Sequence, residues 1–161
     1  MGLYIHGKHS DKECHWGYAP LHWIRDLALM TCGVKKEFSQ ALRSVNFDKN
    51  FNAIDYLNRY YPDLKISNTD LYGLRLAGYY YPNLLFHSDC DGTYTKYGKI
   101  MKDSHWLTGS LAELEMELDL LKSELKKSDI EISEIEQKTL NEFSELVTDE
   151  MKYKRPVIYF S

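Results

Sequence analysis

The sequence predicts a single α/β domain of the α+β type, with a small sheet covered by helices. Short alternating or apolar runs at residues 2–6, 83–88 and 156–160 are typical of strands. Longer segments between them repeat apolar residues at helical spacing, and the last pair forms an acidic helical hairpin. The length of 161 residues suits one domain with a sizeable core, and no repeat or linker divides residues 1–161.

The first half of the chain predicts one strand followed by several helices. Residues 2–7 alternate as a strand, and residues 9–16 are polar enough for a loop. A helix is expected after Gly17, with Pro20 in its first turn and Gly33 as its C-terminal cap. Its apolar stripe comprises Trp23, Ile24, Leu27 and Met30. Further elements are expected as helices at 37–43, 47–59 and about 71–77, with a short strand at 64–66.

The second half combines a short buried strand with two long helices. Leu84–Phe86 is apolar and is followed by turn residues, so we expect a strand that ends near residue 88. Residues 93–101 are expected to be helical. Ser110 begins a leucine-rich helix, and a second helix spans about 133–151. Residues 156–160 predict a terminal strand that pairs with residues 3–5 or with residues 84–86.

Charge and composition exclude some classes of protein. The net charge of −4 argues against binding to a nucleic acid backbone. Residues 1–109 carry a net +2 and residues 110–161 a net −6, so an anion site belongs in the first part. Three cysteines without CxxC spacing fit reduced thiols, and no apolar stretch is long enough to span a membrane. We therefore expect a soluble cytoplasmic protein without a membrane partner.

The stretch from Leu84 to Gly92 concentrates reactive side chains at the predicted strand end. His87, Asp89 and Asp91 alternate there, as they do in some metal-binding turns. A calcium loop would need an acidic residue where Gly98 stands, so this metal is not favoured. A divalent metal site for phosphoester hydrolysis stays open, and the spacing looks like the phosphoesterase motif of the DHH superfamily. Alternatively, the aspartates only bond backbone N–H groups of a turn.

Cysteine chemistry offers a further alternative. Cys14 and His15 would form a zinc site with Cys90 and His87 if the fold brought the two pairs together. A cysteine–histidine nucleophile is open in the same way, although no orienting group can be named. Neither reading assigns a catalytic residue, and the identity of a bound metal stays unknown. We expect no cofactor.

Aromatic side chains predict the other half of a binding site. The chain has 13 Tyr, 6 Phe and 3 Trp, and aromatic faces stack on planar ligands. Trp16 and Tyr18 lie near the start of the first helix beside His15, and Arg25 is expected on the polar helix face. Arg forms paired hydrogen bonds with phosphate. We therefore expect His15, Trp16, Tyr18 and Arg25 to bind a ligand together with the cluster at residues 87–91.

Several of these stretches resemble a family of small, uncharacterised bacteriophage proteins. The resemblance rests on the start Met1-Gly2-Leu3-Tyr4, the stretch Cys14–Ala19 with the following helix, and His-Ser-Asp-Cys-Asp-Gly at 87–92. The leucine-rich segment 111–125 and the strand 157–160 match it too. The resemblance covers about a third of the chain. It implies a phage origin. Small soluble phage proteins without catalytic motifs often counter host defence, and one way is to sequester a nucleotide-derived immune signal.

These observations lead to one functional hypothesis and two alternatives. We expect a non-catalytic protein of the host cytoplasm that binds a small nucleotide-like ligand in an anti-defence role. The first alternative is a metal-dependent phosphoesterase or nuclease that uses His87, Asp89 and Asp91. The second is a protein that binds a host protein through exposed aromatic side chains. Nucleic acid is not expected as a partner, whereas the leucine seam also suits a dimer contact, so a homo-oligomer stays open.

Overall fold

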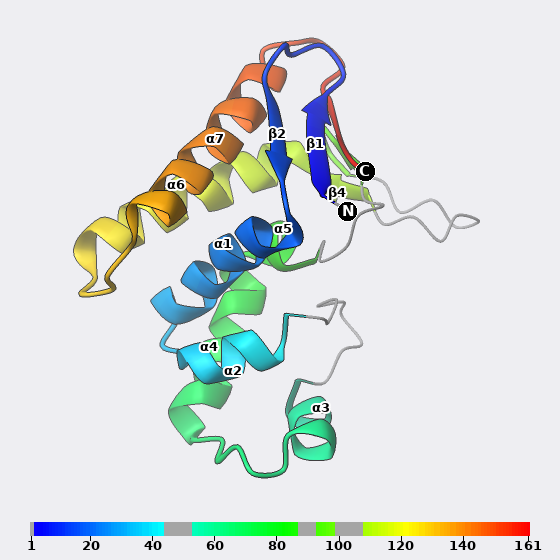
Figure 1. The fold of residues 1–161 in the computed structure, drawn as a ribbon. Helices are drawn as coiled ribbons and strands as arrows, with labels where there is room; N and C mark the ends of the chain where they lie inside the picture. The colour runs from blue at the N-terminus through cyan, green and yellow to red at the C-terminus, as the bar shows by residue number, and fades with distance from the viewer. Residues whose placement is uncertain (1, 44–52, 87–92, 99–107) are drawn as a thin grey trace.

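The computed structural model describes residues 2–43, 53–86, 93–98 and 108–161, and these form a mixed α/β fold (Figure 1). Within these ranges, five strands form one mixed sheet, and seven helices complete the fold. The strands are β1 (Leu3–Gly7), β2 (Glu13–Trp16), β3 (Thr93–Thr95), β4 (Thr108–Ser110) and β5 (Val157–Phe160). The predicted fold class is therefore confirmed.

The last strand of the chain joins the two halves of the sheet, whose order is β2-β1-β5-β3-β4. β5 runs antiparallel to both β1 and β3, and Tyr159 is paired with His6 on one side and with Thr93 on the other. β1 is also antiparallel to β2, while β3 and β4 are parallel. The prediction that residues 156–160 pair with residues 3–5 is confirmed at Ile5, which lies opposite Phe160.

The helices form two groups (Figure 1). They are α1 (Tyr18–Thr31), α2 (Lys36–Ala41), α3 (Ala53–Tyr60), α4 (Asn68–Tyr80), α5 (Pro82–Phe86), α6 (Leu111–Lys127) and α7 (Glu134–Glu150). The predicted hairpin of α6 and α7 lies beside the sheet, whereas α2, α3 and α4 extend away from it. None of the described helices is long and apolar enough to cross a membrane.

Local sequence explains where the main helices begin and end. Ser67 and Ser133 each accept a hydrogen bond from the backbone N–H three residues later, and both N-termini form complete capping boxes. After α1, Gly33 adopts a φ of 89°, which favours glycine and stops the helix as predicted. Ile24 and Leu27 of the predicted α1 stripe are buried, whereas Trp23 and Met30 are only half-buried.

Several predicted elements are wrong. Leu84 and Leu85 belong to the short helix α5, not to a strand, and Pro82 starts that helix because its ring fits the first helical position. The expected loop at 9–16 contains β2, and the expected helix at 93–101 begins instead with β3. Residues 64–66 form no strand. The sheet therefore gains β2, β3 and β4 and loses the predicted strand at 83–88, of which residues 87 and 88 lie outside the described ranges.

Candidate functional site

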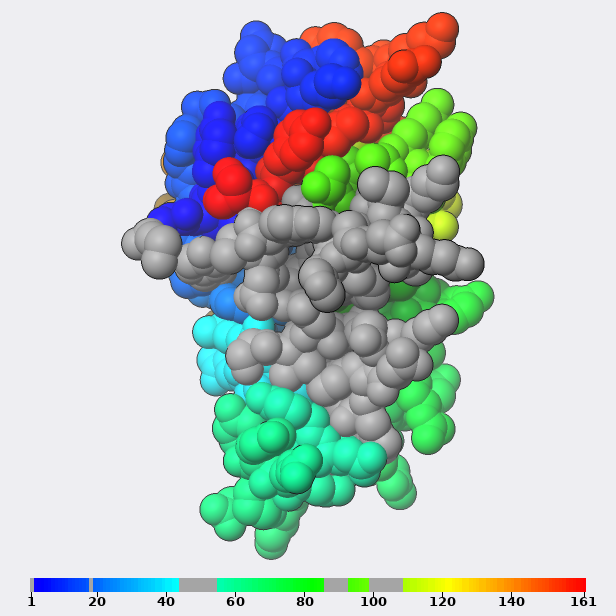
Figure 2. Space-filling view, turned by 90° about the vertical axis from the view of Figure 1, so that its right-hand side faces the viewer, coloured from blue at the N-terminus to red at the C-terminus, as the bar shows by residue number. Residues whose placement is uncertain are grey.

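The two faces of the sheet differ sharply in chemistry. Successive strand residues point to opposite faces, and the inner face packs Leu3, Ile5, Ile158 and Phe160 into the core. The opposite face, here called the outer face, carries polar and aromatic side chains. It comprises Tyr4, His6, Glu13, His15, Thr93, Thr95 and Tyr159, and Val157 lies on it opposite Thr95. Figure 2 shows this face, with β1 and β2 in blue, β5 in red and β3 in green.

Four rings of the outer face stack on one another across three strands. The ring centroids of His15 and Tyr4 are 4.5 Å apart, and those of Tyr4 and His6 are 4.6 Å apart. The His6 ring lies 5.3 Å from that of Tyr159, and the planes differ by only 19–29° within the three pairs. We call these four residues the ring row. Its members are half-buried or exposed, so planar ring surface is concentrated where solvent can reach it.

One carboxylate lies at the β2 end of the ring row. Tyr4 Oη donates a 2.6 Å hydrogen bond to Glu13 Oε2, and His15 Nε2 lies 2.7 Å from Glu13 Oε1. The bond from Tyr4, followed by that from His15, lowers the pKa of Glu13 below its ordinary value. The same bond to the carboxylate raises the pKa of Tyr4. This end of the row therefore carries a carboxylate that is ionised at neutral pH.

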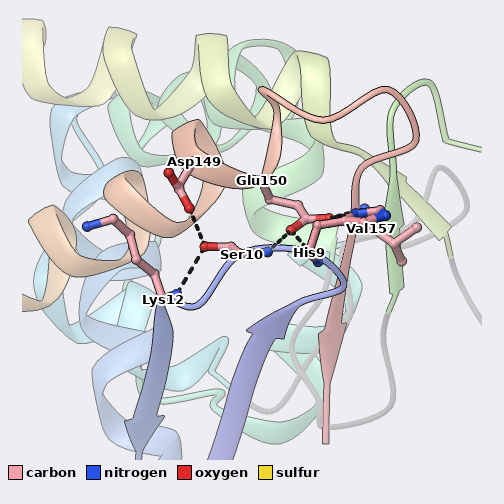
Figure 3. Close-up of polar contacts among 6 residues, drawn as sticks. All are labelled: His9, Ser10, Lys12, Asp149, Glu150 and Val157. Carbon is pink, nitrogen blue, oxygen red and sulfur yellow. Dashed lines mark hydrogen bonds and ion pairs between the residues drawn. The ribbon is translucent and has the colours of Figure 1, made fainter.

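A fully buried carboxylate fixes the strands that carry the ring row (Figure 3). Glu150, the last residue of α7, is 0% exposed and points at the turn between β1 and β2. Its Oε2 accepts hydrogen bonds from the N–H groups of His9 (2.9 Å) and Ser10 (2.8 Å). Its Oε1 accepts one from Val157 N–H at 3.0 Å and lies 2.8 Å from His9 Nδ1. One side chain thus connects α7, the β1–β2 turn and the start of β5.

Further contacts support this anchor. Ser10 Oγ donates to Asp149 Oδ2 at 2.5 Å and accepts from Lys12 N–H at 3.0 Å. A Cβ at Gly7 would collide with the Glu150 carboxylate, so the close approach requires glycine. Desolvation raises the pKa of Glu150, but the hydrogen bonds from Val157 and His9 outweigh it, and the pKa lies below the ordinary value. Glu150 is therefore ionised at neutral pH.

A second buried carboxylate fixes the other half of the sheet. Glu117 of α6 is 5% exposed and accepts hydrogen bonds from the N–H groups of Asn83 (2.9 Å) and Leu84 (2.8 Å) at the start of α5. Asn83 Oδ1 accepts from Ser110 N–H at 2.9 Å, and Tyr94 Oη donates to the Asn83 carbonyl at 2.7 Å. Glu117 and Asn83 thus tie α5 to β4 and β3.

The pKa of Glu117 shifts in the opposite direction to that of Glu150. Desolvation by burial raises the pKa of Glu117 to about 7, and the hydrogen bonds from Asn83 and Leu84 oppose this only in part. The nearby Glu113 carboxylate raises the pKa further. The carboxyl group therefore changes charge near neutral pH, under the strand that presents Thr93 and Thr95.

The structure separates the residues that the sequence places in one aromatic site. His15 points outward from β2 and its side chain is 67% exposed, as a binding role requires. Trp16, expected in a loop, is 8% exposed on the inner face, where its indole Nε1 donates to Glu142 Oε2 at 3.2 Å. Its ring packs edge-on against Phe143, 5.8 Å away. The two neighbours therefore lie on opposite faces of the sheet.

Arg25 does not lie on an exposed helix face. It is 3% exposed, and its guanidinium donates to the carbonyl oxygens of Leu85 at 3.0 Å and Arg43 at 3.3 Å. Asp26, next to it, is also buried and pairs with Arg43. The expectation of an exposed Arg25 is wrong, because backbone carbonyls distant in sequence satisfy its charge inside the core.

Other predicted site residues have no described side chain. Tyr18 begins α1, but its side chain lies outside the described part, as do His87, Asp89 and Asp91.

The geometry of β2 disfavours the predicted zinc site, because Cys14 points inward while His15 points outward. Burial raises the pKa of the Cys14 thiol to about 12, which also disfavours a nucleophile. In the described ranges, no three His, Cys, Asp or Glu side chains are grouped to hold a metal ion.

Sequence reasoning missed Tyr4, His6 and Tyr159 as site residues. The signal was present in the alternation of Leu3-Tyr4-Ile5-His6 and of Ile158-Tyr159-Phe160. If the aliphatic and Phe residues of such strands face the core, the tyrosines and the histidine must face away from it. Which rings meet follows only from the strand order, which no local pattern specifies.

Comparison with protein-family models, curated proteins and solved structures gives no match to this chain.

Proposed function

We propose that this protein binds a small ligand with a planar ring, such as a nucleotide, on the outer face of its sheet, without converting it. The observation that carries this proposal is the ring row. Three strands place four rings side by side on a face that no described helix covers. A row of parallel rings accepts another planar ring at its end, and offset stacking of aromatic rings is favourable.

The chemistry of the face favours binding over turnover. Glu13, the one carboxylate assigned to the outer face, already accepts hydrogen bonds from Tyr4 and His15. The rings of Tyr4 and His6 stack on each other, and they also stack on His15 and Tyr159, respectively. These groups are thus engaged in holding the row together, which suits a preformed binding surface.

The biological role follows from the sequence resemblance. A phage protein that binds a nucleotide-derived signal without hydrolysing it would lower the free concentration of that signal in the infected cell. We propose this sequestration as the anti-defence role. The alternative is hydrolysis of a phosphoester by His87, Asp89 and Asp91, which lie outside the described residues.

Heat release of a bound nucleotide tests the proposal. The protein is incubated with cyclic ADP-ribose isomers and cyclic oligonucleotides, separated from free ligand and denatured by heat, and the supernatant is analysed by chromatography. We expect intact nucleotide from the wild type and little from Tyr159→Ala, which removes an exposed ring of the row. Tyr79→Ala is the matched control, because Tyr79 is 78% exposed on α4 and lies outside the row.

Each alternative predicts a different result. A hydrolysed product in the supernatant supports the phosphoesterase. Absence of any nucleotide from the wild-type protein contradicts the proposed function, and equal release from wild type and Tyr159→Ala removes the ring row from the site.

A further inference from the structure

We infer that the ligand's ring is a nucleobase that binds at the Tyr159 end of the ring row, above Thr93 and Thr95. This inference rests on the proposed function and adds the position and the hydrogen-bonding class of the ligand. It follows from the difference between the two ends of the row, since only an end ring has a face that no other member covers.

At the Tyr159 end, the free ring face has a neighbouring strand beside it. β5 lies between β1 and β3, and the Tyr159 ring stacks on His6 of β1. Its other face is therefore turned towards β3, where Thr93 is its direct cross-strand partner. Thr93 and Thr95 are much smaller than a ring, and Tyr94 between them is buried in the core. The ring row thus ends in a step, with Tyr159 as its wall and the two threonines as its floor.

At the His15 end, no such floor exists. His15 belongs to β2, the edge strand of the sheet, and one face of its ring stacks on Tyr4. No described strand lies beyond it. Glu13 lies beside the ring, and its lowered pKa keeps a negative charge there that repels phosphate. A nucleotide therefore gains more contact and meets less repulsion at the Tyr159 end.

The floor also indicates the class of ring. Thr93 and Thr95 each offer a hydroxyl that donates and accepts hydrogen bonds, and both are half-buried. Such groups match the donor and acceptor edge of a nucleobase better than a purely apolar ring. The floor carries no charge, so it favours an uncharged ring. The phosphates of a nucleotide bound there lie away from Glu13, which is at the opposite end of the ring row.

The strand under the floor is held firmly. Tyr94, between the two threonines, is 1% exposed and donates its hydroxyl proton to the Asn83 carbonyl at 2.7 Å. Asn83 is in turn bound by Glu117. The positions of Thr93 and Thr95 are therefore set by a buried network, and this preorganisation lowers the entropic cost of binding.

Adenosine 5′-monophosphate is a suitable probe, and ribose 5-phosphate is its control without a base. In a titration followed by nuclear magnetic resonance, we expect the monophosphate to shift the methyl signals of Thr93 and Thr95 more than the imidazole signals of His15. Ribose 5-phosphate should shift neither. Substitution of threonine by valine keeps the branched shape and removes only the hydroxyl, so at least one of T93V and T95V should weaken binding about fivefold.

The outcomes separate the two proposals. If the His15 imidazole signals shift, His15→Ala loses affinity and the Thr93 and Thr95 signals stay unchanged, the nucleobase does not bind at the Tyr159 end. The proposed function would still stand in that case. No shift at either end would contradict binding of a nucleotide on the outer face altogether. His15→Ala is the matched variant for the other end, and we expect it to weaken binding less than the more effective of T93V and T95V. Tyr79→Ala, at an exposed ring on α4 outside the row, is the control, and we expect it to retain the affinity of the wild type.

Discussion

Glu150 and Glu117 have the same structural role at two ends of one sheet, yet their pKa values are shifted in opposite directions. Each is a helix residue whose buried carboxylate accepts backbone N–H groups from segments distant in sequence. Glu150 aligns the strands of the ring row, and Glu117 holds the start of α5, where Asn83 is bonded to β3 and β4. The pKa of Glu150 is lowered, whereas burial raises the pKa of Glu117 to about 7.

The difference lies in what surrounds each carboxylate. Glu150 receives three backbone N–H groups and lies beside the His9 ring, and these contacts outweigh its desolvation. Glu117 receives two backbone N–H groups and the Asn83 amide, and Glu113 repels its charge. A buried carboxylate therefore stays ionised only where its donors are numerous enough. Glu150 thus stays ionised at neutral pH, whereas Glu117 changes charge there.

The largest expected effect comes from removing the Glu150 anchor. Glu150→Ala leaves the buried N–H groups of His9, Ser10 and Val157 without their acceptor. We expect a loss of about 3–4 kcal/mol in the free energy of unfolding, measured by urea denaturation at pH 7. Glu145→Ala on the same helix is the control. The Glu145 side chain is 64% exposed and pairs only with Lys12 at the surface, so its loss should change stability by under about 0.5 kcal/mol. Similar values for both variants would show that Glu150 is not an anchor.

The pH dependence of stability tests Glu117. An unfolded glutamate titrates near about pH 4.3, and the folded pKa is about 7, so the folded state holds the proton over this range. The stability contributed by Glu117 is thus complete below about pH 4.3 and is lost as the pH rises through 7. Relative to E117Q, which cannot ionise, the wild type should lose about 3 kcal/mol between pH 4.5 and 7.5.

Paired urea denaturation of wild type and E117Q across that range measures this loss. Taking the difference between the two proteins cancels the other titrating groups, including Glu150, whose contribution has the opposite sign because it is lost as the pH falls. A difference that stays constant with pH would mean that the Glu117 carboxyl has an ordinary pKa.

Much of the fold follows from local pattern, and the errors have identifiable causes. Alternation predicts β1, an apolar run predicts β5, and apolar residues at helical spacing predict α6 and α7. The run Leu84–Phe86 has only three apolar residues, which is too short to show a period, and it folds as a helix. Arg25 is buried because Leu85 and Arg43 supply carbonyls that no local sequence reveals.

The two buried carboxylates Glu117 and Glu150, by contrast, can be recognised from the sequence pattern. Glu117 stands three residues after Leu114, inside the apolar stripe of α6, and Glu150 stands three residues after Val147 in the stripe of α7. A carboxylate at a position where the spacing predicts leucine indicates a buried charge with dedicated partners. What the sequence cannot give is the identity of those partners, since the donors come from residues 9, 10 and 157 in one case and from residues 83 and 84 in the other.

The smallest expected effect concerns Glu13, a third carboxylate that accepts short hydrogen bonds but lies on the surface. Tyr4→Phe removes the 2.6 Å bond from Tyr4 Oη and keeps the ring in its stack. Because water replaces the lost donor, the urea midpoint should not change measurably, while the pKa of Glu13 should rise towards its ordinary value. A carbon-detected titration of the Glu13 carboxyl group measures this rise, and Tyr97→Phe is a control at an exposed tyrosine outside the row. A loss of stability as large as that of Glu150→Ala would instead mean that the Tyr4–Glu13 hydrogen bond is needed for folding, which would contradict its description as a surface contact.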